Sequence, residues 1–322
     1  MTGVYITGKI PDEGIYLLRK KGYKVEINDS SKKLTQDELK AVFSKFDAII
    51  TLLTDLVDNE VIGSASPKLK IISNYSAGFD NVDVLSASRR GVVTTNTPGV
   101  AGEAVSEHTF ALILACRKRI LAGDKYVRLG KFTGFDSTAF VAPQLRGETI
   151  GIIGLGKIGM NVGRMAYEGF RMNILYHDIL RYEDFEILTE AKFTNLEHLL
   201  KKADVVTIHC PLTSATYHLI GKEQLELMKK SAILINTSRG RIVDEKALIW
   251  ALGENKIAAA GLDVFENEPF VSHELTTLGN VVLTPHVASA TLETRTAMAK
   301  IAAQNIIDVF EGRTPAGLIK VG

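Results

Sequence analysis

This sequence contains little cysteine and carries almost no net charge. Only two of its 322 residues are cysteine, Cys116 and Cys210, and they form no C-x-x-C pair. This usage predicts a reducing, cytoplasmic compartment and no metal site such as a structural zinc. The 38 basic and 37 acidic residues leave a formal net charge of +1, which argues against a nucleic-acid partner, because a dedicated binder carries a basic stripe.

Long apolar runs are absent as well. No stretch approaches the roughly 18 apolar residues that cross a bilayer, so we expect no membrane partner. The opening residues, MTGVYITGKIPDEG, lack a basic head followed by an apolar core, and we expect no signal peptide. The hydrophobic fraction is nevertheless 46%, which is ample for large cores, and the length is typical of about two domains.

The segment from Thr149 to Asp178 has the pattern of a dinucleotide-binding unit. A β-branched apolar run over 150–153 predicts a buried strand. A helix-like segment and a second apolar run, 174–176, follow, and His177 and Asp178 close that run. Between the first strand and the helix, glycines occupy the positions of G-x-G-x-x-G, namely Gly154, Gly156 and Gly159.

Each glycine has a physical reason in such a unit. Gly154 permits a tight turn, Gly156 lets the backbone approach a pyrophosphate, and Gly159 lets helix and strand pack closely. The first N–H groups of the helix would face the phosphates. Asp178 lies 24 residues after Gly154, near the spacing of an acid that binds the adenosine ribose. We interpret the segment as an NAD site, with a Gly-rich turn in another α/β domain as the alternative.

Apolar runs and helical patches alternate on both sides of this segment. Strands are predicted at 4–7, 47–52, 71–73, 92–94, 205–209, 232–236, 259–264 and 281–284. Helices are predicted at 11–21, 36–43, 103–120 and 292–311. This alternation predicts an α/β fold with mostly parallel sheets. The first hundred residues carry no phosphate loop, so we assign them to a separate, smaller domain.

The stretch from Gly123 to Gly147 has weak periodicity and several aromatic residues. It contains Phe132, Phe135 and Phe140. We interpret it as an extended arm, because aromatic residues usually need a partner surface to bury them. A surface loop folded on its own domain is equally compatible with the sequence.

Three residues with chemical potential follow predicted strands. They are Arg239 in NTSRGRIVDE, Glu268 in GLDVFENEP and His286 in LTPHVASA. Ligands of doubly wound sheets bind beyond the carboxyl ends of strands. An arginine grips a carboxylate with two parallel hydrogen bonds, and a histidine backed by a carboxylate is a general acid or base. Taken singly, each could be a surface or structural residue; their order after the Gly-rich loop favours catalysis.

With these motifs, the sequence resembles the D-2-hydroxyacid dehydrogenase family. Within the family it is most similar to the glyoxylate/hydroxypyruvate reductase and D-glycerate dehydrogenase branch. The resemblance covers essentially the whole chain and is carried by NYSAGFDNVD, GIIGLGKIG, HCPLTSATYHLI, LINTSRGRIVDEKAL, GLDVFENEP and TPHVAS.

The resemblance implies a role for each matching residue. Arg239 would bind the carboxylate and carbonyl of the substrate, His286 would protonate the carbonyl oxygen, and Glu268 would hydrogen-bond His286. The substrate contacts would come from Leu53, Ser76, Ala77 and Gly78. The cofactor contacts would come from Gly154, Gly156, Lys157, Ile158, Gly159, Asp178, Cys210, Pro211, Thr216, Thr237, Ser238, Asp263, His286 and Ala288.

The resemblance also implies the architecture. Two Rossmann-like, doubly wound parallel-sheet domains are expected, with the cofactor domain inserted into a flavodoxin-like substrate domain and a cleft between them. Residues 1–99 and 290–322 would form the substrate domain. Residues 100–289 would form the NAD-binding domain, whose arm near 123–147 would embrace a second subunit to give a homodimer.

Two positions depart from the branch. Its members often carry a tryptophan in the arm, whereas the only tryptophan here is Trp250, so Phe135 or Phe140 would have to substitute for it. Arg171 stands where a glycine is common after the phosphate-loop helix, which would affect only the helix end.

The predicted activity is NAD-dependent reduction of glyoxylate or hydroxypyruvate to the D-2-hydroxy acid. The alternatives are 3-phosphoglycerate dehydrogenase, D-lactate dehydrogenase and a non-enzymatic, NAD-sensing corepressor. Asp178 favours NAD over NADP because its charge repels a 2′-phosphate. Arg181, three residues later, could soften that preference by binding the phosphate.

Overall fold

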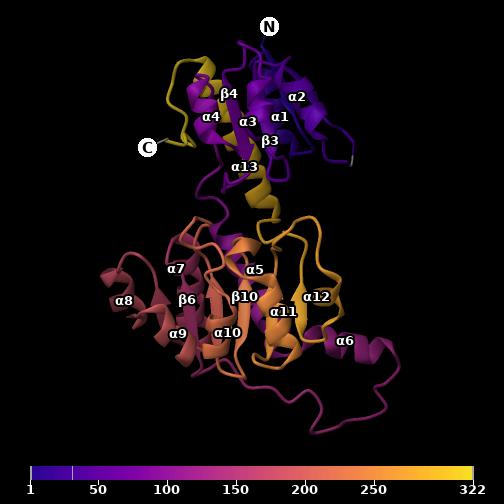
Figure 1. The fold of residues 1–322 in the computed structure, drawn as a ribbon, viewed down its shortest axis with the longest axis vertical. Helices are drawn as coiled ribbons and strands as arrows, with labels where there is room; N and C mark the ends of the chain where they lie inside the picture. Colours follow the sequence, from indigo (N-terminus) through magenta and orange to yellow (C-terminus); the bar gives the residue numbers. More distant parts are fainter. Residues whose placement is uncertain (1, 31, 321–322) are drawn as a thin grey trace. The chain divides into compact units, whose positions relative to one another are not determined.

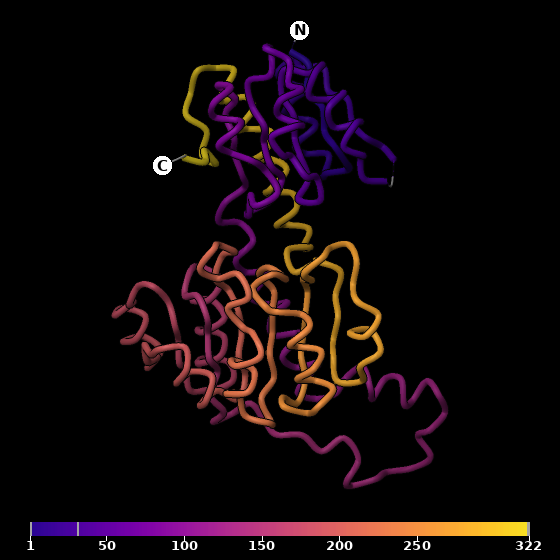
Figure 2. The backbone as a smooth tube through the Cα atoms, viewed as in Figure 1, coloured from indigo at the N-terminus to yellow at the C-terminus, as the bar shows by residue number. Residues whose placement is uncertain are grey.

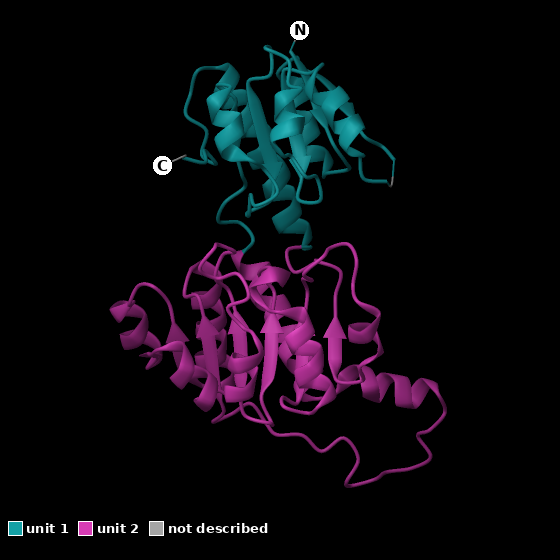
Figure 3. Cartoon of the chain, in the orientation of Figure 1, with its two compact units in different colours: residues 1–101, 290–322 teal, residues 102–289 magenta. Residues whose placement is uncertain are grey.

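The chain folds into two compact α/β units, which we describe separately (Figure 3). The computed structural model describes residues 2–30 and 32–320. Unit 1 consists of residues 1–101 with 290–322, and unit 2 of residues 102–289. Among the described residues, no helix combines the length and the apolar character needed to span a membrane.

Unit 1 contains a five-stranded parallel sheet. Its order is β2-β1-β3-β4-β5, and its strands are β1 (Gly3–Ile6), β2 (Lys24–Ile27), β3 (Ala48–Leu52), β4 (Ile71–Tyr75) and β5 (Val93–Thr95). Helices α1 (Asp12–Lys20) and α13 (Leu292–Phe310) cover one face. Helices α2 (Gln36–Phe43), α3 (Asn59–Gly63) and α4 (Val84–Arg89) cover the other (Figure 1).

The helix at the C-terminal end of the chain packs tightly on the first helix. Gly14 in α1 lies so close to α13 that a Cβ atom there would sit 2.5 Å from the carbonyl oxygen of Ala299. A larger residue at position 14 would separate the two helices, which interiors packed at crystal-like density do not tolerate.

Unit 2 contains a seven-stranded parallel sheet of order β12-β11-β10-β9-β6-β7-β8. Its strands are β6 (Thr149–Ile153), β7 (Asn173–His177), β8 (Lys192–Phe193), β9 (Val205–Ile208), β10 (Ile233–Asn236), β11 (Ala259–Leu262) and β12 (Val281–Leu283). Strand order reverses at β6, whose neighbours are β7 and β9. In doubly wound sheets that reversal point is where ligands bind.

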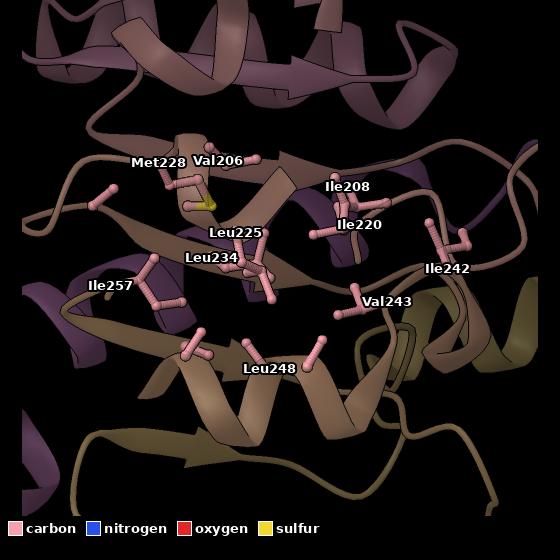
Figure 4. Packing of buried hydrophobic residues seen from close by; sticks show 14 of the residues in the cluster. Val206, Ile208, Ile220, Leu225, Met228, Leu234, Ile242, Val243, Leu248 and Ile257 are labelled. Atoms are coloured by element: carbon pink, nitrogen blue, oxygen red, sulfur yellow. The ribbon is translucent and has the colours of Figure 1, made fainter. Parts of the chain in front are cut away.

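Helices cover both faces of the unit 2 sheet. On one face lie α5 (Gly102–Arg117), α7 (Lys157–Arg164) and Phe185 of α8 (Glu183–Thr189). On the other lie α9 (Leu196–Lys202), α10 (Lys222–Leu227) and α11 (Glu245–Gly253), whose apolar side chains meet those of the strands (Figure 4). A short helix, α12 (His273–Thr277), precedes β12. The predicted fold class, α/β with parallel sheets, is confirmed.

The prediction for residues 103–147 was partly wrong. The expected helix ends at Arg117, because Arg119 adopts the left-handed conformation with φ 52°. A separate helix, α6 (Ile120–Arg128), then occupies the start of the predicted arm. From about residue 131 to 147 the chain runs without helix or strand (Figure 2).

Two edge strands and one helix end also differ from simple expectation. β2 and β8 were not predicted; both lie at sheet edges, and they are short and carry lysine, so they lack the apolar run of a buried strand. After α7, a π-helical turn (Met165–Gly169) leads to Arg171, which has φ 52°. A left-handed conformation costs an L-residue roughly 1–2 kcal/mol, which explains why glycine suits this position.

Candidate active site

The Gly-rich loop after β6 is shaped by its glycines. Gly154 has φ 90°, and a Cβ atom there would lie 2.5 Å from the backbone nitrogen of Cys210. A Cβ atom on Gly159 would lie 2.2 Å from the carbonyl oxygen of Gly154. At Gly156, by contrast, a Cβ atom would meet nothing within 4 Å. The packing of the protein therefore explains Gly154 and Gly159, and the open space at Gly156 suits a ligand that approaches the backbone.

The first turn of α7 faces that same loop. The helix begins at Lys157, its N-cap is Gly156, and no side chain caps it. Its first N–H groups are therefore left for a bound anion. Lys157 is exposed, and Ile158 is half-buried. A pyrophosphate fits this donor set, so the residues present suit a dinucleotide.

Asp178 is attached to the loop by hydrogen bonds. It follows β7, and its Oδ2 accepts a hydrogen bond from the N–H of Leu155 at 2.6 Å, while its Oδ1 accepts from the N–H of Leu180 at 3.1 Å. Each carboxylate oxygen has a second lone pair. The side chain is thus positioned beside the Gly-rich loop with capacity left for ribose hydroxyls.

The loop after β9 forms the neighbouring wall. Cys210 is buried, and its carbonyl oxygen accepts a hydrogen bond from Ser238 Oγ at 2.5 Å. Burial raises the pKa of the Cys210 thiol to about 11. The side chain is therefore an uncharged thiol that lines the site and does not act as a nucleophile. Thr216 Oγ1 donates to the carbonyl oxygen of Pro211 at 2.6 Å, which fixes the turn beyond it.

Arg239, Glu268 and His286 follow three neighbouring strands, β10, β11 and β12. His286 Nδ1 lies 2.8 Å from Glu268 Oε2, and the N–H of Phe265 donates to Glu268 Oε1 at 3.0 Å. The side chains of His286 and Glu268 are 28% and 33% exposed. With Nδ1 held by the carboxylate, the other ring nitrogen, Nε2, is the one left for chemistry with a substrate.

The loops that carry Arg239 and Glu268 are in direct contact. A Cβ atom on Gly240 would lie 1.9 Å from the carbonyl carbon of Phe265, so only glycine fits there. The side chain of Asn236 also holds the backbone at Arg239, because Asn236 Nδ2 donates a hydrogen bond to the Arg239 carbonyl oxygen at 2.9 Å. Gly240 was not among the predicted site residues, although it directly follows Arg239 in the sequence.

Asp263 fixes the segment that carries His286. Its carboxylate accepts hydrogen bonds from Thr284 Oγ1 at 2.6 Å, from the N–H of Val287 at 2.9 Å and from the N–H of Ala288 at 2.8 Å. His108 Nε2 lies 3.4 Å from Asp263 Oδ1. Burial by itself would raise the pKa of Asp263, but these hydrogen bonds outweigh it and hold the pKa below its usual value. Asp263 therefore stays anionic and positions the loop of His286.

His108 and Thr284 were not among the predicted site residues. His108 Nε2 lies 2.9 Å from Thr284 Oγ1, although α5 and β12 are far apart in sequence. Thr237 lies nearby and shares a hydrogen bond of 3.1 Å with Thr109 Oγ1. No local motif marks His108, because its partner Thr284 lies 176 residues later in the chain.

The predicted substrate contacts lie in unit 1. Leu53 follows β3, and Ser76, Ala77 and Gly78 follow β4, which is its neighbour in the sheet. Ser76 is buried, Leu53 and Gly78 are half-buried, and Ala77 is exposed. These four residues therefore lie at the carboxyl ends of adjacent strands.

One side chain, Asn81, connects these two loops. Its Nδ2 donates to the carbonyl oxygens of Leu52 at 3.1 Å and Asp55 at 2.9 Å, and its Oδ1 accepts from Asn74 Nδ2 at 2.9 Å. Asn74 Nδ2 also donates to the carbonyl oxygen of Gly78 at 2.9 Å. The Asn74–Asn81 pair was not predicted, and it ties the loop of Leu53 to the turn at Gly78.

A Rossmann-type sheet, a Gly-rich loop and an acid after the second strand are the features of a dinucleotide-binding unit. The sequence pattern of the "D-isomer specific 2-hydroxyacid dehydrogenase, NAD binding domain" matches residues 110–288. The chain belongs to the D-isomer specific 2-hydroxyacid dehydrogenase family.

Relatives resemble the chain over nearly its full length. Glyoxylate reductase from Thermococcus litoralis is 44% identical over 320 residues, covering 98% of this chain and 96% of that one. The enzyme of the same name from Thermofilum pendens is 46% identical over 319 residues, covering 98% and 94%. An NADPH-dependent glyoxylate/hydroxypyruvate reductase from Sinorhizobium meliloti, solved with NADP and malonate, superimposes with a TM-score of 0.86 at 30% identity, covering 99% and 96%. The chain is therefore an oxidoreductase.

Proposed function

We propose that this protein reduces glyoxylate or hydroxypyruvate to the corresponding D-2-hydroxy acid. The observation that carries the proposal is the His286–Glu268 hydrogen bond of 2.8 Å, with Arg239 after the neighbouring strand. Full-length relatives named glyoxylate reductase support the substrate class. A bound nicotinamide supplies the hydride for this reaction.

The residues of the chain bind the keto acid and deliver the proton. The planar fork of Arg239 holds the carboxylate and carbonyl of the substrate. His286 donates the proton from Nε2 to the carbonyl oxygen, and Glu268 holds Nδ1 and so orients the ring. We propose that the backbone N–H groups of Ala77 and Gly78 also donate hydrogen bonds to the substrate carboxylate. Leu53 and Ser76 would lie beside it.

For the cofactor we propose NAD(H) over NADP(H). The support is the position of Asp178, whose carboxylate accepts from the N–H of Leu155 in the Gly-rich loop. Two like charges about 4 Å apart near a surface repel by on the order of 1–4 kcal/mol, so a 2′-phosphate is disfavoured there. The ratio of kcat/KM for NADH and NADPH tests this, and equal values would contradict it.

We further propose a homodimer in the reducing environment of the cytoplasm. The arm exposes large apolar side chains within unit 2, among them Leu129 at 58%, Phe132 at 64% and Phe135 at 93%. Such a concentration of exposed apolar residues marks an interaction surface. Both cysteines are free and buried, which suits a reducing compartment.

A steady-state assay tests the proposed activity. NADH oxidation is measured with glyoxylate, hydroxypyruvate, pyruvate and phosphohydroxypyruvate as substrates. We expect the first two to have the highest kcat/KM, because Leu53 and Ser76 offer no cation to a phosphate and burying an unpaired phosphate is costly. If phosphohydroxypyruvate leads, the protein is a phosphoglycerate dehydrogenase; if pyruvate leads, it is a D-lactate dehydrogenase.

A further inference from the structure

The segment between β7 and α8 holds a cation that is already paired. Arg181 lies three residues after Asp178, and its side chain is 57% exposed. Its Nε and Nη2 donate to the two carboxylate oxygens of Glu186 at 2.9 and 2.7 Å. This is the bidentate geometry in which an arginine also binds phosphate, so the face of Arg181 that would bind a phosphate is occupied by Glu186.

Glu186 is itself held from inside the unit. Tyr176, a buried residue of β7, donates from Oη to Glu186 Oε1 at 2.7 Å, and that Oη accepts from the N–H of Tyr182 at 2.9 Å. The Glu186 side chain is only 16% exposed. Hydrogen bonds from Arg181 and then Tyr176 lower the pKa of Glu186 to about 2. The carboxylate is therefore charged and fixed in place at any working pH.

These contacts decide what a cofactor meets beside Asp178. An NADP(H) molecule with its ribose at Asp178 would place the 2′-phosphate among the residues that follow β7, and Arg181 is a cation of that segment. We propose that Glu186 is a specificity-determining residue that holds Arg181 in a closed ion pair and so withholds it from the 2′-phosphate. The inference rests on the proposed preference for NAD(H) and assigns part of that preference to a residue of α8.

The test is a double-mutant cycle on the full-length protein. NADH and NADPH are titrated without keto acid, and Kd is measured by nucleotide fluorescence. E186Q keeps a hydrogen-bond acceptor for Tyr176 and removes the charge that binds Arg181. It should lower the Kd for NADPH about tenfold, the lower range for one charge-assisted contact at an exposed site, and leave the Kd for NADH within about twofold.

The second arm of the cycle separates release of Arg181 from loss of a negative charge. R181A in the native background should barely change the Kd for NADPH, whereas R181A added to E186Q should abolish the gain. E190Q is the matched control: it removes a carboxylate just after α8, where Glu190 accepts from Tyr167 Oη at 3.1 Å. That variant should leave both dissociation constants unchanged.

Two outcomes would overturn the inference. One is an unchanged Kd for NADPH in E186Q, and the other is an equal loss from R181A in both backgrounds. If E186Q does not fold, E186D serves as the second variant, since a shorter carboxylate cannot hold both Tyr176 and Arg181. A protein that binds NADH in these titrations and reduces no keto acid would contradict the proposed function but not this inference.

Discussion

Single carboxylates with different partners do most of the positioning around the candidate active site. Glu268 accepts from His286, whereas Glu266, two residues earlier, lies 3.0 Å from His218 Nε2. Asp263 is buried and accepts three hydrogen bonds from the segment after β12, and His108 of α5 lies 3.4 Å from its Oδ1. A carboxylate thus orients a proton donor at Glu268, joins two loops at Glu266 and fixes a segment at Asp263, depending on its neighbours.

The first prediction compares two neighbouring glutamates. E268Q should lower kcat for keto-acid reduction by about tenfold to a hundredfold, because His286 loses the anion that orients it. E266Q removes the same charge from the His218 pair and should change kcat by less than about threefold. Steady-state kinetics with saturating NADH measures both. Equal losses in the two variants would show that Glu268 has no special relation to His286.

The second prediction concerns the stability that Asp263 provides. D263N places an amide against the N–H donors of Val287 and Ala288 and should lower the free energy of unfolding at pH 7 by about 1–3 kcal/mol. Since the pKa of Asp263 is lowered in the folded state, its contribution is complete above the unfolded value of about 3.9 and is lost as the pH falls through the folded value. Urea unfolding of both proteins from pH 7 to pH 3 measures the difference, which should shrink with acid; a constant difference would contradict the prediction.

Within each unit, the secondary-structure elements place the candidate residues at one edge of the sheet, because the strands of that sheet are parallel. The carboxyl ends of β10, β11 and β12 carry the catalytic candidates, and those of β3 and β4 carry the predicted substrate contacts. Beyond the last two, the Asn81 side chain joins the ends of the strands, because it donates to Leu52 and Asp55 after β3 and accepts from Asn74 of β4. The geometry of the loops thus depends on amide side chains.

The third prediction tests this connection between loops. N81A removes the hydrogen bonds to Leu52 and Asp55 and should raise KM for the keto acid about fivefold to twentyfold, because backbone donors that move bind a carboxylate less well. The variant should change kcat less than KM and should leave the Kd for NADH unchanged. N59A, at the exposed start of α3, is the control. If kcat falls as much as kcat/KM while KM stays constant, Asn81 does not position the substrate loops.

For the whole molecule, the arm is the feature that a single chain does not explain. Helix α6 has no buried residue, and Val127, Phe132 and Phe135 remain largely exposed. In other parts of unit 2, two large cores hold many apolar side chains of this size, although residues such as Ile187 and Phe270 are also exposed. Helix α6 contributes no side chain to either core. This contrast supports the proposal that a second copy of the chain covers the arm.

The fourth prediction is the oligomeric state. The wild type should elute as a dimer in size-exclusion chromatography with light scattering. The double variant F132S/F135S should shift the equilibrium toward monomer, because each lost aromatic side chain removes about 1.5–3 kcal/mol of burial per subunit. F79S, at another exposed phenylalanine, should not. A dimer of unchanged stability in F132S/F135S would remove these residues from the interface.

The sequence by itself determined the features that depend on neighbours along the chain. The β-branched run before Gly154, the three glycines and Asp178 specify a strand, a turn, a helix and a second strand, because each choice acts within a few residues. The positions of the remaining strands along the chain, apart from the edge strands β2 and β8, followed from buried apolar runs of the same kind. Fold class and family were therefore predictable before any coordinates were known.

Only the tertiary structure decided which side chains meet. Asn81 reaches a carbonyl oxygen 29 residues earlier in the chain, and Asp263 meets His108 of α5, a helix that precedes β6 in the chain. Arg181 and Glu186 are five residues apart, yet their pairing requires the first turn of α8 and the buried hydroxyl of Tyr176. Such partners are chosen by packing across the sheet, which brings residues of any separation to hydrogen-bond distance and leaves no periodic trace in the sequence.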